Sequence, residues 1–206
     1  MVFQSKGARY YLAPKGLKVL RKAELADEKS LHVMYKNKSL SEEFVDQHID
    51  IIRLYLAISS SYPNKLHIFT NTELIPYSEF PANTRPDLYI RSITAKANNL
   101  KEYMLYSFIG KRPYAIRKLF DAIVEHFDSG DWEEEAETAY PTLLIVCTDT
   151  RAEQSTRRYI ATKLDNMGID DLNVLTTTIR GLLNSNKANR AVWSSVLELE
   201  QTSLYS

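Results

Sequence analysis

One uninterrupted apolar run, Leu143–Cys147, constrains the fold of this chain more than any other feature. A strand with one face in water alternates apolar and polar residues, whereas this run contains no polar residue before its terminal cysteine. Runs of this kind are typical of strands that are buried on both faces, as in a parallel sheet covered by helices. We therefore expect a central strand here with helices on both sides of its sheet.

Hydrophobic periodicity places further elements around this run. A capping-box spacing at Ser39 and Glu42 opens a helix, and Gly168 is expected to end another. The predicted helices cover residues 39–59, 113–127 and 151–167, and the other predicted strands cover 66–70, 86–91, 102–108 and 173–179. The resulting order, α-β-β-β-α-β-α-β, predicts an α/β fold with a mixed sheet flanked by helices.

Weaker patterns give four further expectations. A short strand is predicted at Leu31–Tyr35, and a helix is predicted for the tail that contains Val192, Trp193, Val196 and Leu197. The acidic run at residues 131–137 is predicted to be a solvated loop. His48 falls on the apolar side of the first predicted helix, so we expect it in the core rather than on a metal.

Composition limits the compartment and the kind of partner. The 206 residues include a single cysteine, Cys147, which excludes an intramolecular disulfide and fits a reducing compartment. No apolar run approaches the roughly 20 residues that span a bilayer. We therefore expect a cytoplasmic protein with no membrane partner, in which Cys147 is a small core residue.

The formal net charge is zero, but the charges are distributed unevenly. Residues 1–22 contain no acid and carry six basic residues, namely Lys6, Arg9, Lys15, Lys18, Arg21 and Lys22. A basic segment of this kind attracts polyanions, so contact with nucleic acid is confined to particular faces rather than excluded by the neutral total.

The dipeptide Pro86-Asp87 opens the second predicted strand, and the α-β-β-β-α-β order around it resembles the core of restriction-endonuclease-like proteins. The resemblance implies that Mg²⁺ is held by this aspartate and by the acid of an acid-x-Lys motif on the next strand. The metal ion would activate a water molecule for attack on the phosphate. Glu73 could supply a further acid.

The third predicted strand departs from that motif. Its expected positions hold Tyr106-Ser107-Phe108, or Leu105-Tyr106-Ser107 in the alternative register, and neither contains an acid or a lysine. Glu102 lies at the start of this predicted strand, and Lys111 comes after the strand has ended. Asp87 therefore has a second interpretation, in which it accepts hydrogen bonds from nearby backbone N–H groups and holds no metal.

The segment Tyr10–Leu20, with its Leu-x-Pro-x-Gly turn, resembles the wing strand and final helix of a winged-helix domain. Together with the downstream core, the chain is similar to the replication-relaxation family of plasmids, phages and integrative elements. The resemblance divides the chain into a partial winged-helix segment with a linker, residues 1–38, and a nuclease-like α/β domain, residues 39–206. Only residues 1–7 precede Ala8, so the usual recognition helix is not expected within this chain.

The sequence thus predicts a non-catalytic DNA-associated protein that needs no cofactor and acts in replication or mobilisation of such an element. Its expected partners are the phosphate backbone of DNA and other replication or transfer proteins, and a homodimer is compatible with the sequence. Lys6, Arg9, Lys15, Lys18 and Arg21 are the predicted DNA-binding residues. Two alternatives stay open. One is an Mg²⁺-dependent nuclease that uses Asp87 and Glu73, with Glu102 as a further candidate acid, and the other is a pure protein-interaction module.

Overall fold

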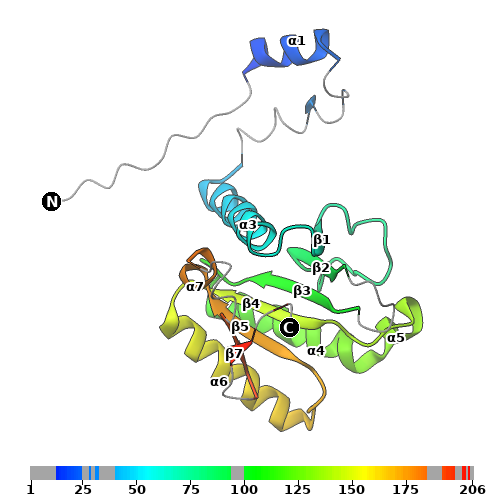
Figure 1. The fold of residues 1–206 in the computed structure, drawn as a ribbon, viewed down its shortest axis with the longest axis vertical. Coiled ribbons are helices and arrows are strands. Elements are labelled where there is room, and N and C mark those ends of the chain that lie inside the picture. The colour runs from blue at the N-terminus through cyan, green and yellow to red at the C-terminus, as the bar shows by residue number, and fades with distance from the viewer. Residues whose placement is uncertain are drawn as a thin grey trace, which may run out of the picture. The chain divides into compact units, whose positions relative to one another are not determined.

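A computed structural model describes residues 13–24, 28, 31–32, 40–93, 100–184, 192–197, 201–202 and 204 (Figure 1). The chain divides into two units, Met1–Asp46 and Gln47–Ser206. This division lies inside a helix, α3, whereas the sequence placed the boundary after residue 38.

The larger unit contains a mixed sheet with seven strands in sequential order from β1 to β7. The first three strands form an antiparallel meander, β3, β4 and β5 run parallel to one another, and the last two strands are antiparallel additions. The strands are β1 (Leu66–Thr70), β2 (Leu88–Ser92), β3 (Glu102–Ser107), β4 (Thr142–Cys147), β5 (Val174–Thr178), β6 (Trp193–Ser195) and β7 (Gln201–Thr202). The predicted α/β class with a mixed sheet is therefore confirmed.

Helices cover both faces of this sheet (Figure 1). The two helices that connect the parallel strands, α4 (Pro113–Ser129) and α6 (Thr150–Met167), pack on one face. Helices α3 (Glu42–Ser61) and α7 (Ile179–Leu183) pack on the other. Both crossovers place their helices on the same face of the sheet. Because α4 follows β3 and the α6 helix follows β4, the first turns of these helices lie near the carboxyl ends of the two strands.

The apolar run of the sequence is the central strand β4. Leu143, Ile145 and Cys147 belong to the core under α4 and α6, whereas Leu144 and Val146 belong to the core under α3. All five side chains are at most 1% exposed, which confirms that the strand is buried on both faces. The lone thiol is thus a core group, and burial raises its pKa to about 11.

Two predicted helix ends have the expected backbone geometry. Pro14 is the first residue of α1 (Pro14–Lys22) in the smaller unit, where its missing N–H leaves no helical hydrogen bond unmade. Gly168 ends α6 with a φ of 67°, a left-handed conformation in which a side chain would be strained. The N-cap of α3 differs from the prediction, because the Ser41 hydroxyl accepts the N–H of Phe44 at 3.2 Å, while Ser39 lies outside the described residues.

The buried side of α3 also differs from the predicted stripe. Leu54 and Ile58 are buried, whereas Phe44, Ile52 and Tyr55 are exposed. His48 is exposed as well, so the core position predicted for it is wrong. The apolar residues of α3 lie on more than one side of the helix, and the packing against the sheet selects the side that is buried.

Three further expectations are wrong. The tail forms a strand rather than a helix, because Ser195 and Ser194 pair with β5 and complete an edge of the sheet. Leu31 and His32 are helical rather than extended, and residues 33–35 lie outside the described part. The acidic run forms a short helix, α5 (Asp131–Ala136), rather than a solvated loop.

A buried tryptophan fixes α5 to the sheet. Trp132 is 1% exposed and its ring lies 5.2 Å from that of Phe80, 5.7 Å from that of Tyr140 and 6.3 Å from that of Tyr89. The acids on either side remain in solvent, where they are favoured by the positive end of the short helix.

None of the helices in the described ranges is both long and apolar enough to cross a lipid bilayer.

Replacement of Trp132 by alanine tests the docking of α5. We expect Trp132→Ala to lower the free energy of unfolding by about 3–5 kcal/mol, because it empties a large site among aromatic rings. The matched control is Glu134→Ala on the exposed side of the same helix, which should change stability by less than about 0.5 kcal/mol. Urea unfolding followed by circular dichroism measures both, and equal values for the two variants would contradict this account.

Candidate functional site

Asp87, the aspartate of the Pro-Asp pair, is held at the start of β2 by the strands on both sides. Its N–H donates to the carbonyl of Leu105 at 2.9 Å, and its own carbonyl accepts the N–H of Asn71 at 3.1 Å. The Asn71 side chain also donates to the carbonyl of Pro86 at 2.9 Å. These bonds give the aspartate a fixed place at the end of the sheet.

The carboxylate of Asp87 is partly used by the backbone. Oδ2 accepts the N–H of Ser107 at 2.7 Å, and the side chain is 21% exposed. This is the second interpretation reached from the sequence, in which the aspartate accepts a backbone N–H group. The bond ties the start of β2 to the end of β3.

Core residues occupy the positions on and after β3 at which the nuclease resemblance places an acid-x-Lys motif. Leu105, Tyr106 and Phe108 are at most 3% exposed, and they alternate between the two cores of the sheet. The Tyr106 hydroxyl donates to the carbonyl of Thr84 at 2.7 Å, and burial raises the pKa of this phenol. In both registers these side chains offer no carboxylate or ammonium group to a metal or phosphate.

Lys111 lies beside Asp87, although the sequence suggested that it comes too late in the chain. Its Nζ is 3.9 Å from Oδ2 of Asp87, and its side chain is 25% exposed. A turn after β3 brings it there: the N–H of Lys111 donates to the carbonyl of Phe108, and Gly110 adopts a φ of 69°. The only signal in the sequence was this glycine, whose left-handed conformation allows the chain to reverse.

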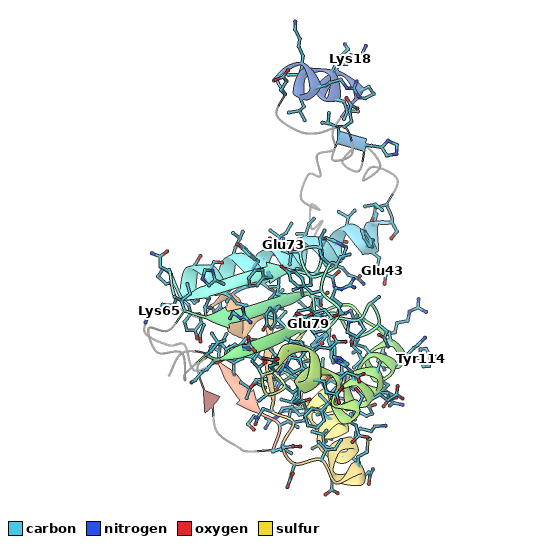
Figure 2. All side chains as sticks on the ribbon, turned by 90° about the vertical axis from the view of Figure 1, so that its right-hand side faces the viewer. Lys18, Glu43, Lys65, Glu73, Glu79 and Tyr114 are labelled. Atoms are coloured by element: carbon cyan, nitrogen blue, oxygen red, sulfur yellow. The ribbon has the colours of Figure 1, made fainter. Side chains whose placement is uncertain are left out.

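Glu73 is at the same end of the sheet, in the connection that follows β1 (Figure 2). Its Oε2 accepts both the N–H and the hydroxyl of Thr70, each at 2.7 Å. Because Thr70 donates two hydrogen bonds to the carboxylate, the pKa of Glu73 is lowered. The carboxylate therefore closes a local turn.

Glu102 lies at the other end of β3 from Asp87. Ser107 is five positions further along the strand, which corresponds to about 17 Å. Its carboxylate is bonded to Arg91 at 2.8 Å and to the Thr138 hydroxyl at 3.2 Å, and its side chain is only 6% exposed. The structure thus excludes Glu102 from any site that contains Asp87.

The predicted DNA-binding residues fall partly within the smaller unit's helix α1. Lys15 and Lys18 of the predicted set share one side of the helix with Lys22, which was not predicted, because the three are spaced at i, i+3 and i+7. All three are exposed (Figure 2 labels Lys18). Arg21 forms an ion pair with Glu28, which raises its pKa and leaves it less available to a phosphate. Lys6 and Arg9 lie outside the described residues, as does the predicted wing strand before Pro14.

Within the described ranges, no three histidine, cysteine or acidic side chains gather in a way that could hold a metal ion. Comparisons of the chain with protein-family models, with curated proteins and with solved structures found no match.

The role of Asp87 in joining β2 to β3 can be measured. Asp87→Ala leaves the N–H of Ser107 without its acceptor, so we expect a loss of about 1–3 kcal/mol in the free energy of unfolding. Asp87→Asn keeps an acceptor oxygen and should lose less. Asp128→Ala, which changes an exposed aspartate of α4, is the control in urea unfolding. Wild-type stability in Asp87→Ala would show that the bond contributes nothing.

The lowered pKa of Glu73 predicts a dependence of stability on pH. A carboxyl whose folded pKa is below its unfolded value stabilises the protein above the unfolded pKa and loses that effect as the pH falls through the folded pKa. Stability should therefore decrease on acidification below about pH 4.5, the ordinary pKa of this carboxyl, and Glu73→Gln should make this decrease smaller.

Carbon-13 NMR titration of the Glu73 carboxyl gives the direct measurement. The expected midpoint is below 4.5, and it should rise in Thr70→Ala, which removes the hydroxyl donor and keeps the backbone donor. A midpoint at or above 4.5 in the wild type would contradict the hydrogen bonds described here.

Proposed function

We propose that this chain is a non-catalytic, DNA-associated protein with a restriction-endonuclease-like core, similar in kind to replication-relaxation proteins of plasmids, phages or integrative elements. One observation carries the proposal. The carboxylate of Asp87 accepts a backbone N–H and faces Lys111, and no described acid joins it in a metal-holding cluster. In this arrangement the aspartate is a structural group.

The order and direction of the elements support a nuclease-like core. Helix α3 precedes three antiparallel strands, and α4 then leads to β4, which lies parallel to β3. Asp87 stands at the start of the second strand, which is where the resemblance places the first metal-binding acid. The resemblance is therefore one of topology and of a single residue, without the acid-x-Lys motif that the resemblance places on the next strand.

The exposed lysines of α1 support contact with the phosphate backbone. Lys15, Lys18 and Lys22 form one cationic side on a helix that carries no acid. Lysine contacts of this type position a protein on DNA without reading its sequence. The sequence-specific part of replication or mobilisation would then come from partner proteins of the element.

An Mg²⁺-dependent nuclease is the second candidate, and the position of Lys111 favours it. A lysine 3.9 Å from the aspartate resembles the pairing in working enzymes, although it follows β3 instead of lying within it. Glu73 would have to leave its two bonds with Thr70 to serve as the second acid.

A binding experiment tests the main proposal. We expect a short DNA duplex to bind with an affinity that falls steeply with salt, since phosphate contacts release counterions. Lys18→Ala should weaken binding uniformly across DNA sequences and reduce the slope of log K against log salt by about 1. Lys163→Ala, which changes a lysine already paired with Asp121, should leave the slope unchanged.

Fluorescence anisotropy over a range of salt concentrations gives this slope. Absence of DNA binding at low salt would overturn the proposal and favour a protein-interaction module.

A cleavage assay separates the two DNA-related candidates. Plasmid DNA incubated with the protein and Mg²⁺ should remain supercoiled on an agarose gel. Cleavage that disappears in Asp87→Ala, under conditions where the variant is shown to be folded by circular dichroism, would establish the nuclease instead.

A further inference from the structure

A cleft of about 180 Å³ opens at the carboxyl ends of the parallel strands β3 and β4. Its walls come from two segments, Phe108–Arg117 and Cys147–Tyr159, which contain the first turns of α4 and α6. In α/β proteins ligands bind outside the carboxyl ends of the parallel strands, and here the cleft lies at those ends, between two helices on the same face of the sheet. Tyr114, in the first turn of α4, is exposed and lies outside the lining (Figure 2).

The charged side chains that line this cleft, Lys111 and Arg117, are both positive. The guanidinium carbon of Arg117 lies 5.6 Å from the ring centre of Tyr159, and no described carboxylate is ion-paired with it. Lys111 has Asp87 as a neighbour, but at 3.9 Å this contact is at the outer limit of an ion pair. Both cations can therefore contact an anion in the cleft.

Hydroxyl groups and apolar side chains complete the lining. Thr148 and Ser155 are exposed in the cleft, and in the described part of the chain neither hydroxyl has a hydrogen-bond partner. The hydroxyl of Tyr159 is different, because it donates to Asp121 at 3.2 Å. Phe108 and Ile116 supply apolar surface beside these polar groups.

We propose that this cleft binds a nucleoside monophosphate group, with its phosphate on Lys111 and Arg117 and its sugar against the apolar wall. A phosphomonoester carries about −1.5 to −2 charges near pH 7, which matches two cations better than the single charge of a carboxylate or phosphodiester does. The volume of about 180 Å³ is below the roughly 300–1,000 Å³ of sites that enclose a whole drug-sized ligand, so the cleft holds the phosphate and sugar and leaves the base outside.

Such a group has two sources, a free nucleotide and the 5′-phosphorylated end of a DNA strand. The second source rests on the proposed DNA association, whereas the first does not. In both cases Asp87 competes with the phosphate for Lys111, so the aspartate at the start of β2 weakens binding in the cleft.

Titration of the full chain with deoxyadenosine 5′-monophosphate, followed by NMR or calorimetry, tests the proposal. Lys111→Ala and Arg117→Ala should each weaken binding by about tenfold, the effect of losing one charge-assisted hydrogen bond. Lys118→Ala, which changes an exposed lysine of α4 outside the lining, should have no effect. Asp87→Asn should strengthen binding by about two- to fivefold, because Lys111 loses a competing partner.

Oligonucleotides with a 5′-phosphate or a 5′-hydroxyl distinguish the two sources. Tighter binding of the phosphorylated strand, lost in Arg117→Ala and kept in Lys18→Ala, assigns the cleft to strand ends. Binding of the mononucleotide with no preference between the strands assigns it to free nucleotides, which also supports the proposal.

Two results would overturn the assignment. One is the absence of any response to the mononucleotide or to the 5′-phosphate, and the other is binding of inorganic phosphate as tight as that of the mononucleotide. Failure of the DNA-association proposal can be distinguished from failure of the cleft proposal. In the first case the DNA duplex would not bind at low salt, while the mononucleotide would still bind.

Discussion

The burial of β4 on both faces is the constraint on which the rest of the larger unit depends. A strand with no polar side needs hydrogen-bonded neighbours along both edges and helices over both faces. The parallel pairing with β3 and β5 meets the first requirement, and α3, α4 and α6 meet the second. The same pairing brings the carboxyl ends of β3 and β4 together, which is where the cleft with Lys111 and Arg117 lies.

At the end of the sheet near Asp87, one carboxylate both accepts a backbone hydrogen bond and faces a positively charged side chain. The aspartate joins β2 to β3 through the N–H of Ser107, and it also faces the ammonium group of Lys111. A carboxylate with these two partners has less capacity left for a metal ion. The positions of β3 nearest to Asp87 are filled by buried side chains, and the acid of that strand, Glu102, lies at its other end.

The two basic regions belong to different units and differ in kind. The lysines of α1 form an open cationic side that suits the repeating charge of a phosphate backbone. The cleft instead places two cations and two hydroxyl groups around a confined volume, which suits a single phosphate group. An open surface provides attraction without discrimination, whereas a lined cleft can distinguish one phosphate ester from another.

The sequence by itself determined the helices and strands of the core. The continuous apolar run of Leu143–Cys147, the proline at the start of α1 and the glycine after α6 are local signals, because burial on two faces and backbone conformation restrict which residues are allowed. Tyr106 and Phe108 likewise show from the sequence that these positions carry neither the acid nor the lysine of the nuclease motif. These features need no knowledge of distant contacts.

Only the tertiary structure decided which residues meet. Lys111 lies next to Asp87 because a turn reverses the chain after β3. Glu102 lies far from Asp87 because it is at the opposite end of β3. Part of the tail becomes β6 because its backbone pairs with that of β5. Helix α5 is held in place because the ring of Trp132 packs against aromatic side chains such as Phe80. The physical reason is the same in each case: these outcomes depend on partners far away in the chain, and local spacing carries no information about them.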